Sequence, residues 1–421
     1  MTRSNLETPA GRWRLALLLD APHRLGFAAA ALVLALSGLW WAAVIGARAV
    51  GHEPAWAVAP TLAHGLLFGF GFMPLFFTGF LFTAGPRWLQ VPRVAARELL
   101  VPVAACVGGW LLFVLGAHLQ ARLAAAGLAL AAVAFGSVTL RFLRLLRASR
   151  AEDRLHPGVI AGGCVVVCAA LVLASLGLAA GAPLLARLAL YAGLWGGIAL
   201  VHFTALHRMV PFFGSAAPLL DAWRPTWLLA LLGAALALEA AGAAAELAWW
   251  PLPAGWRVGQ VAFEAPLALL LLGLALRWLV LQPVARLRLV AMLHTGFVWL
   301  GLAFALQAVA HALQAGGDAA GLGLAPLHAL AMGFFGSTFL AMVTRVSSGQ
   351  GGRTIAADAV LWRLFWLLQL ATLARLAGAL WPAAAPLALP LAAVAWAACM
   401  LAWALRYGRW YGRARTDGRA G

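Results

Sequence analysis

The chain has 421 residues, of which 64% are hydrophobic and only 10% are charged, and its mean hydropathy is +0.92. Soluble proteins carry about 25% charged residues, so this composition excludes a soluble enzyme or a secreted disulfide-bonded scaffold and predicts an integral membrane protein. The net charge of +17 comes from 30 basic residues, all of them arginine. Because they are scattered singly, we assign them to membrane topology and expect no nucleic acid partner.

Twelve apolar segments follow one another, joined by short links rich in Gly, Pro and Arg. Each is long enough to cross the lipid bilayer as a helix of about 20 residues. They lie near residues 25–49, 58–84, 95–117, 119–140, 158–181, 185–207, 225–247, 258–281, 287–313, 323–344, 359–380 and 385–405. We therefore predict an all-α, polytopic membrane protein with a single transmembrane domain over 1–421 and short tails at 1–24 and 406–421.

The arginines predict the orientation of these spans. With the N-terminus in the cytoplasm, 25 of the 30 fall on the cytoplasmic side. The outer side then keeps five: Arg48, Arg122, Arg187, Arg257 and Arg375. Cytoplasmic loops are enriched in basic residues, so both termini are expected in the cytoplasm, which requires an even number of spans.

Two histidines inside the spans are the leading functional candidates, because ionisable groups within a membrane are costly and commonly functional. His64 in span 2 and His328 in span 10 each lie some five residues from the outer end of their span, at roughly 7–8 Å depth. Two helices that run the same way thus present imidazoles at one level, where they can ligate one metal. The alternative is a pair of buried histidines satisfied by neighbouring carbonyls or water.

Residues on the same helical faces suit a flat porphyrin. Phe68 and Gly71 follow His64 at helical spacing, and Met332 and Phe335 follow His328. Aromatic side chains would fill the edges of such a group and the glycine would leave room for it. Ordinary helix packing also explains a stripe of this kind.

A second group of histidines lies nearer the cytoplasmic side, with His202 and His207 in span 6 and His294 in span 9. Five residues separate His202 from His207, or about 140° around a helix, which disfavours their binding one ion together. His202 and His294 lie at similar depth and form the better pair, with His207 as a third candidate. Imidazole ligands suit copper, iron or zinc, whereas His207 also fits a solvated residue at the interface.

Carboxylates are scarce in the spans. Glu239 lies in span 7, Glu246 at its outer edge, and Glu264 in the outer third of span 8. Three roles suit them: neighbours of haem propionates, a proton relay, or counter-ions to arginine. His311, near the outer end of span 9, is expected to be reached by water.

Several motifs together resemble the NnrS family of haem- and copper-containing membrane proteins. They are AHGLLFGF (63–70) continuing to GFLFTAGPRW (79–88), HRMVPFF (207–213), LHTGFVWLGLAFAL (293–306) and HALAMGFFGSTFLAMVTRVSSGQGGR (328–353). The chain departs from the family at Gly65, where a Glu is common, and at 349–353, where GQGGR replaces GHTGR.

The resemblance implies a bacterial inner-membrane protein that acts in tolerance to nitric oxide and binds haem, of type b, and copper through membrane histidines. His64, His207, His294 and His328 match family positions, whereas His202 rests on its depth alone. The implied partners are the lipid bilayer, nitric oxide or its iron complexes, and an electron donor. Binding and redox turnover of nitric oxide both remain open.

A wider resemblance is to the twelve-span subunit of haem-copper oxidases, which also ligates a low-spin haem with histidines on spans 2 and 10. Span 7 lacks the adjacent His pair of those oxidases, and span 6 lacks His-x-x-x-Tyr, so a proton-pumping oxidase is not expected. Two alternatives of other classes remain. One is a transporter of haem, copper or another small molecule with histidines as transient ligands, and the other is a structural partner of a respiratory complex.

Overall fold

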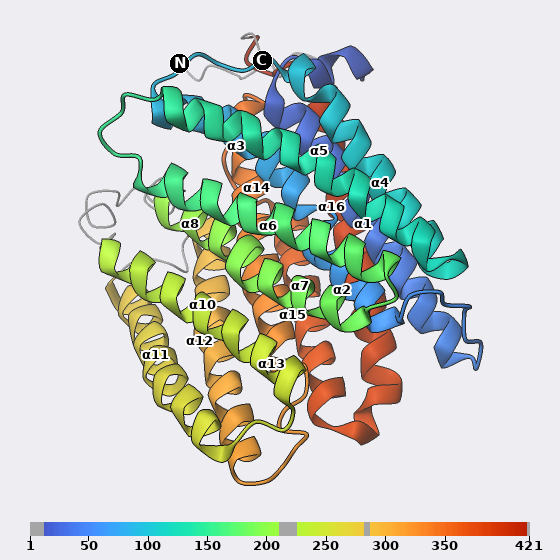
Figure 1. Ribbon diagram of the computed structural model, residues 1–421. Coiled ribbons are helices and arrows are strands. Elements are labelled where there is room, and N and C mark those ends of the chain that lie inside the picture. The colour runs from blue at the N-terminus through green and yellow to red at the C-terminus, as the bar shows by residue number, and fades with distance from the viewer. Residues whose placement is uncertain (1–11, 210–224, 282–286, 419–421) are drawn as a thin grey trace.

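The computed structural model describes residues 12–209, 225–281 and 287–418, and every regular element in these ranges is a helix (Figure 1). Twelve helical segments of this part of the chain are long and apolar enough to span a membrane. In chain order they are α1 (Pro22–Ala49), α2 with α3 (Pro60–Phe70, Met73–Leu89), η2 with α4 (Ala96–Leu99, Leu100–Leu119), α5 (Ala121–Ala148), α6 (Leu155–Ala179), α7 with η3 and α8 (Pro183–Gly193, Leu194–Ala199, Leu200–Met209), α10 (Thr226–Trp249), α11 (Ala254–Leu281), α12 (Arg288–Ala315), α13 with η6 and α14 (Ala325–His328, Ala329–Phe335, Gly336–Gln350), α15 (Ala359–Leu380), and η7 with α16 (Pro382–Ala384, Ala385–Tyr411).

These helices confirm the predicted all-α class and all twelve predicted spans. Most ends agree within a few residues, and the largest differences are extensions at the C-terminal ends of helices such as α5 and α16. The part of the HRMVPFF motif at 210–213 and the outermost residues of both tails lie outside the described residues.

The first and last spans lie side by side, and the described chain begins and ends at the same end of the bundle (Figure 1). The backbone N–H of Arg14 donates to the carbonyl of Gly412 at 2.8 Å, and Nη1 of Arg24 donates to the carbonyl of Arg413 at 2.8 Å. Both ends of an even number of spans must lie on one side of a membrane, and these contacts join them there.

Spans 2 and 10 form the centre of the bundle. The most apolar stretch of span 2 is 83% buried and that of span 10 is 78% buried, whereas the other ten range from 33% to 56%. The side chains of these two spans therefore face protein rather than lipid, which positions His64 and His328 inside the molecule.

Both central spans are irregular, and so is span 6. Span 2 breaks between α2 and α3 at Gly71 and Phe72. Pro74, in the first turn of α3, lacks the N–H that would bond to the carbonyl of Phe70 and continue α2. The segments η3 in span 6 and η6 in span 10 are π-helical, a form that is frequent at functional sites. His328 directly precedes η6, and His202 follows η3 by three residues.

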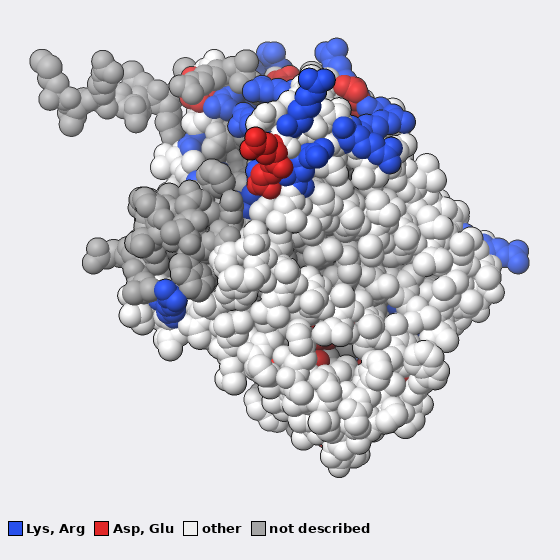
Figure 2. Space-filling model, turned by 60° about the vertical axis from the view of Figure 1, so that its left-hand side comes forward, with Lys and Arg blue, Asp and Glu red and all other residues white. Residues whose placement is uncertain are grey.

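The outer surface of the bundle suits a lipid environment. Large apolar side chains such as Val133, Leu269 and Leu387 are exposed, and helices satisfy their backbone groups without water. Figure 2 shows that arginines gather at the end of the molecule where the described chain begins and ends, above a broad uncharged surface. We predict from the arginine rule that this end faces the cytoplasm.

Candidate functional site

The imidazoles of His64 and His328 face one another across the two central spans. Their ring centroids are 6.5 Å apart and their planes differ by only 9°. With metal–imidazole bonds of about 2 Å and ring centres roughly 1 Å behind the bonding nitrogens, two axial imidazoles on one metal would have centres about 6 Å apart. The observed centroid spacing is close to this value.

The two rings are held in different ways. Nδ1 of His328 lies 2.9 Å from the carbonyl of Leu324 and donates to it, so Nε2 keeps its lone pair for a ligand. His64 stacks on Trp41 with ring centroids 4.2 Å apart, and its Nδ1 has no hydrogen-bond partner in the described structure. Together the histidines supply unoccupied nitrogens, as axial metal ligands require.

One of the predicted face residues, Phe68, lies against the paired histidines. Phe68 contacts the His64 ring at 4.4 Å between centroids. Both it and Met332 are half-buried, as are the two histidines, although they belong to the most buried spans. These side chains therefore retain surface that a flat macrocycle can cover.

The other two predicted face residues have different roles. Gly71 lies at the break of span 2, where an added Cβ would be 2.4 Å from the carbonyl oxygen of Leu67. This glycine is needed by the backbone of the break itself. Phe335 lies farther along span 10 and packs against His202, with ring centroids 5.0 Å apart.

Arg375, which the sequence predicted only as one of the outer-side arginines, lies near enough to the paired histidines to interact with them electrostatically. It lies on α15, five residues before the C-terminal end of that helix, and the interaction involves both His64 and His328. Within the described residues it has no ion-pair or hydrogen-bond partner. An unpaired cation inside a membrane protein is costly, so this position favours a ligand that brings negative charge.

His202 lines an apolar cavity between α1, α3, α8 and α14, whose walls include Phe27, Met73, Phe76 and Phe339. Its Nε2 lies 2.8 Å from Oγ1 of Thr338. The Thr338 hydroxyl donates its hydrogen to the carbonyl of Phe334 at 2.7 Å, so His202 must donate from Nε2, and Nδ1 keeps a lone pair.

The structure does not bring His202, His207 and His294 together. His294 donates from Nε2 to the carbonyl of Ala275 on α11 at 2.8 Å. His207 pairs with His156, whose Nε2 lies 3.0 Å from Nδ1 of His207. No group of three or more metal-binding side chains occurs among the described residues.

Sequence reasoning passed over His156 because it lies beside a predicted loop. In the structure it is buried in the first turn of α6. Its Nδ1 also lies 3.4 Å from Nη1 of Arg208. The sequence does not indicate this contact, because whether His156 meets His207 depends on how α6 and α8 are rotated about their axes.

His311 also differs from expectation. It was predicted to be reached by water, but it is only 2% exposed, because Glu264 of α11 and Gln307 of its own helix cover it. Both oxygens of Glu264 lie 2.9 Å from Nδ1 of His311. This places His311 in a second buried polar cluster, formed by the C-terminal halves of α10 and α12 and the N-terminal half of α11.

The fold and the facing histidines define a twelve-span membrane protein with a candidate metal-binding site between its two central spans. The family model described as "NnrS protein" matches residues 17–415, nearly the whole chain, and the chain belongs to this NnrS family. No curated protein and no solved structure matches the chain at a significant level.

Proposed function

We propose that this protein holds a b-type haem between His64 and His328 and acts in nitric oxide tolerance in the bacterial inner membrane. The observation that carries the proposal is the pair of parallel imidazoles 6.5 Å apart. Haem iron takes histidine as an axial ligand in many proteins. The NnrS family is associated with haem and copper, which supports the same assignment.

Arg375 supports haem over a bare metal ion. Haem carries two propionate groups, and their negative charge would pair with the Arg375 guanidinium, which has no partner among the described residues. Phe68 and Met332 would contact the macrocycle. When bound, haem would supply reversible one-electron chemistry and an iron atom with affinity for nitric oxide.

The residues of the chain would fix this group and shield it. The hydrogen bond to Leu324 sets the tautomer and direction of His328, and Trp41 holds the plane of His64. Such fixed rings favour a resident cofactor over cargo bound transiently by a transporter. The proposal covers binding or redox turnover of nitric oxide or its iron complexes, with an electron donor in the second case.

Copper is not assigned to His202, His207 and His294, because these side chains have separate partners. His202 alone borders an apolar cavity, and an uncharged molecule such as nitric oxide suits that environment. We propose the cavity as the place where nitric oxide reaches the bundle interior.

The function is tested in cells that lack the protein and are exposed to a nitric oxide donor. The wild-type chain should restore growth, whereas His64→Ala and His328→Ala should not, at equal membrane levels. His52→Ala is the matched control because His52 is exposed in a loop. Growth restored equally by all four chains would contradict the proposal.

A further inference from the structure

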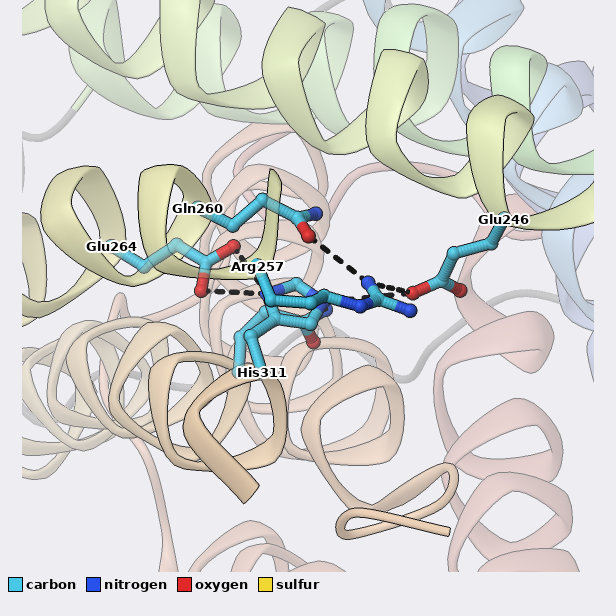
Figure 3. Close-up of polar contacts among 6 residues, drawn as sticks. Glu246, Arg257, Gln260, Glu264 and His311 are labelled. Atoms are coloured by element: carbon cyan, nitrogen blue, oxygen red, sulfur yellow. Dashed lines mark hydrogen bonds and ion pairs between the residues drawn. The ribbon is translucent and has the colours of Figure 1, made fainter. Parts of the chain in front are cut away.

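Five charged or titratable side chains gather within the outer half of the bundle, apart from the paired histidines. Figure 3 shows Glu246, Arg257, Glu264 and His311 among them. Glu239 and Glu246 come from α10, Arg257 and Glu264 from α11, and His311 from α12. Four of them are nearly inaccessible, with exposures of 6% for Glu239, 1% for Arg257, 3% for Glu264 and 2% for His311. Only the Glu246 side chain, which is 32% exposed, reaches the surface.

The side chains follow one another from that surface inwards. Oε1 of Glu246 lies 3.7 Å from Nε2 of His311, and Nδ1 of His311 lies 2.9 Å from Glu264. Glu264 in turn interacts electrostatically with Glu239. Seven residues separate Glu246 from Glu239 on α10, so the series covers about 10 Å of membrane depth.

The composition of the cluster requires bound protons. Three carboxyl groups surround one permanent cation, Arg257, which pairs with Glu246 and also donates to Oε1 of Gln260 at 3.0 Å. With every carboxyl ionised and His311 neutral, the cluster would carry two uncompensated negative charges, which a low-dielectric interior disfavours. In addition, Glu239 and Glu264 interact electrostatically, and two neighbouring carboxyl groups repel one another when both are ionised, which favours a proton on one of them.

The neighbouring elements add little to this balance. From α7, Tyr191 interacts electrostatically with Glu246 and with Arg187. Gln307 of α12 places its amide nitrogen 3.1 Å from Nε2 of His311. Arg257 also keeps one buried nitrogen, Nη2, without a hydrogen-bond partner in the described structure.

We propose that this cluster is a proton relay that connects the outer surface with the middle of the membrane. Histidine can accept a proton at one ring nitrogen while it releases one from the other. A proton leaves the carboxyl of Glu246 for Nε2 of His311, the Nδ1–H bond of His311 breaks, and an O–H bond forms on Glu264, which shares the proton with Glu239. The inference does not depend on haem at His64 and His328.

The test is infrared spectroscopy of the purified protein during transfer from water to D2O. The wild type should show the carbonyl band of a protonated carboxylic acid, and the band should be lost in Glu239→Gln or Glu264→Gln. Its shift in D2O should be at least tenfold slower in Glu246→Gln and in His311→Gln. Glu53→Gln is the matched control, since Glu53 is an exposed outer-loop carboxylate paired with Arg48, and it should exchange at the wild-type rate.

Two results would overturn the relay. One is a wild-type spectrum without a protonated carboxylic acid. The other is wild-type exchange in Glu246→Gln, a surface change that spares the buried core and so tests the entry step even if His311→Gln does not fold. Thermal unfolding of each variant, measured on the same preparation, distinguishes lost structure from lost exchange.

Discussion

At the scale of single residues, the site depends on which ring nitrogens are already engaged. His328 and His202 each use one nitrogen in a hydrogen bond to a neighbouring group, Leu324 or Thr338, and keep a lone pair on the other. His294 and His207 each donate a hydrogen bond from Nε2 to a backbone carbonyl, that of Ala275 and that of Pro225. Equal depth along two spans predicted that His64 and His328 would lie close together, and their rings do. His202 and His294 were predicted to lie at similar depth, but they bond to Thr338 and Ala275, because depth does not specify where on the helix circumference a side chain lies.

Removing the charge of Arg375 should change the haem rather than the fold. We expect Arg375→Gln to lower the haem reduction potential by several tens of millivolts. A unit charge about 10 Å away is worth roughly 1–2 kcal/mol at an effective dielectric constant of 20, and 59 mV corresponds to tenfold for one electron. The measurement is a redox titration followed by absorbance.

Arg122→Gln is the matched control for this titration, because Arg122 is also on the predicted outer side but is exposed. Its potential should equal that of the wild type. Equal haem reduction potentials for the wild type, Arg375→Gln and Arg122→Gln would contradict the proposal that Arg375 lies beside the haem.

The Thr338 hydroxyl should stabilise the protein through its hydrogen bond with His202, in addition to the packing of the Thr338 side chain. We expect Thr338→Val to destabilise the protein by about 1–3 kcal/mol, because a buried imidazole N–H loses its acceptor. Thr372→Val is the matched change, since the buried Thr372 hydroxyl bonds only to the carbonyl of Leu368 in its own helix. Thr372→Val should lower the stability of the protein less than Thr338→Val does. Equal losses of stability in thermal unfolding of the two variants would contradict the role of Thr338.

At the scale of elements, α4 and α5 pack through glycines at van der Waals contact. A Cβ on Gly109 would lie 2.7 Å from the carbonyl oxygen of Gly127 and 2.9 Å from the backbone nitrogen of Ala131, whereas a Cβ on the adjacent Gly108 meets nothing within 4 Å. Small residues allow helices in membranes to approach closely in this way.

Substitution by alanine at these two adjacent glycines should therefore affect the stability of the protein differently. Gly109→Ala should cost about 1–3 kcal/mol, because the two backbones must separate. Gly108→Ala should be neutral or stabilising, since alanine favours a helix by up to about 1 kcal/mol over glycine. Unfolding of both variants by heat in detergent checks the pair, and a Gly109→Ala protein as stable as Gly108→Ala would refute the close contact.

The helices themselves could be predicted because a span is dictated by apolar length. The interruptions within these helices could not be predicted from the sequence. Pro74 and Gly71 are compatible with a continuous kinked helix as well as with the observed break, and the π-helical segments η3 and η6 have no signature in residue type. The buried cluster of His311 and Glu264 was also missed, because ends of spans are wet only when no neighbouring helix covers them.

At the scale of the whole molecule, the arginines predict which side faces the cytoplasm. The two described ends of the chain lie together, and arginines gather around them (Figure 2). We expect a fluorescent protein fused after Gly421 to fluoresce, because it folds in the cytoplasm, and a periplasmic phosphatase fused after Gly317 to be active. The opposite pattern, a dark C-terminal fusion and an inactive phosphatase at 317, would reverse the topology.

The central position of spans 2 and 10 is the property of the whole fold that matters most for function. It brings the rings of His64 and His328 together, with Phe68 against His64. Arg375 interacts electrostatically with both histidines. Sequence predicted the two histidines, but the role of Arg375 needed the position of α15 relative to both, which no local pattern encodes.

The most direct measurement is a reduced-minus-oxidised absorption spectrum of the detergent-purified protein, with pyridine haemochrome and metal analysis on the same sample. The proposed site predicts a low-spin b-type haem in the wild type and in His52→Ala, and its loss or conversion to a high-spin form in His64→Ala and in His328→Ala. A colourless preparation from haem-replete cells, or an unchanged low-spin spectrum in both histidine variants, would contradict haem ligation by this pair.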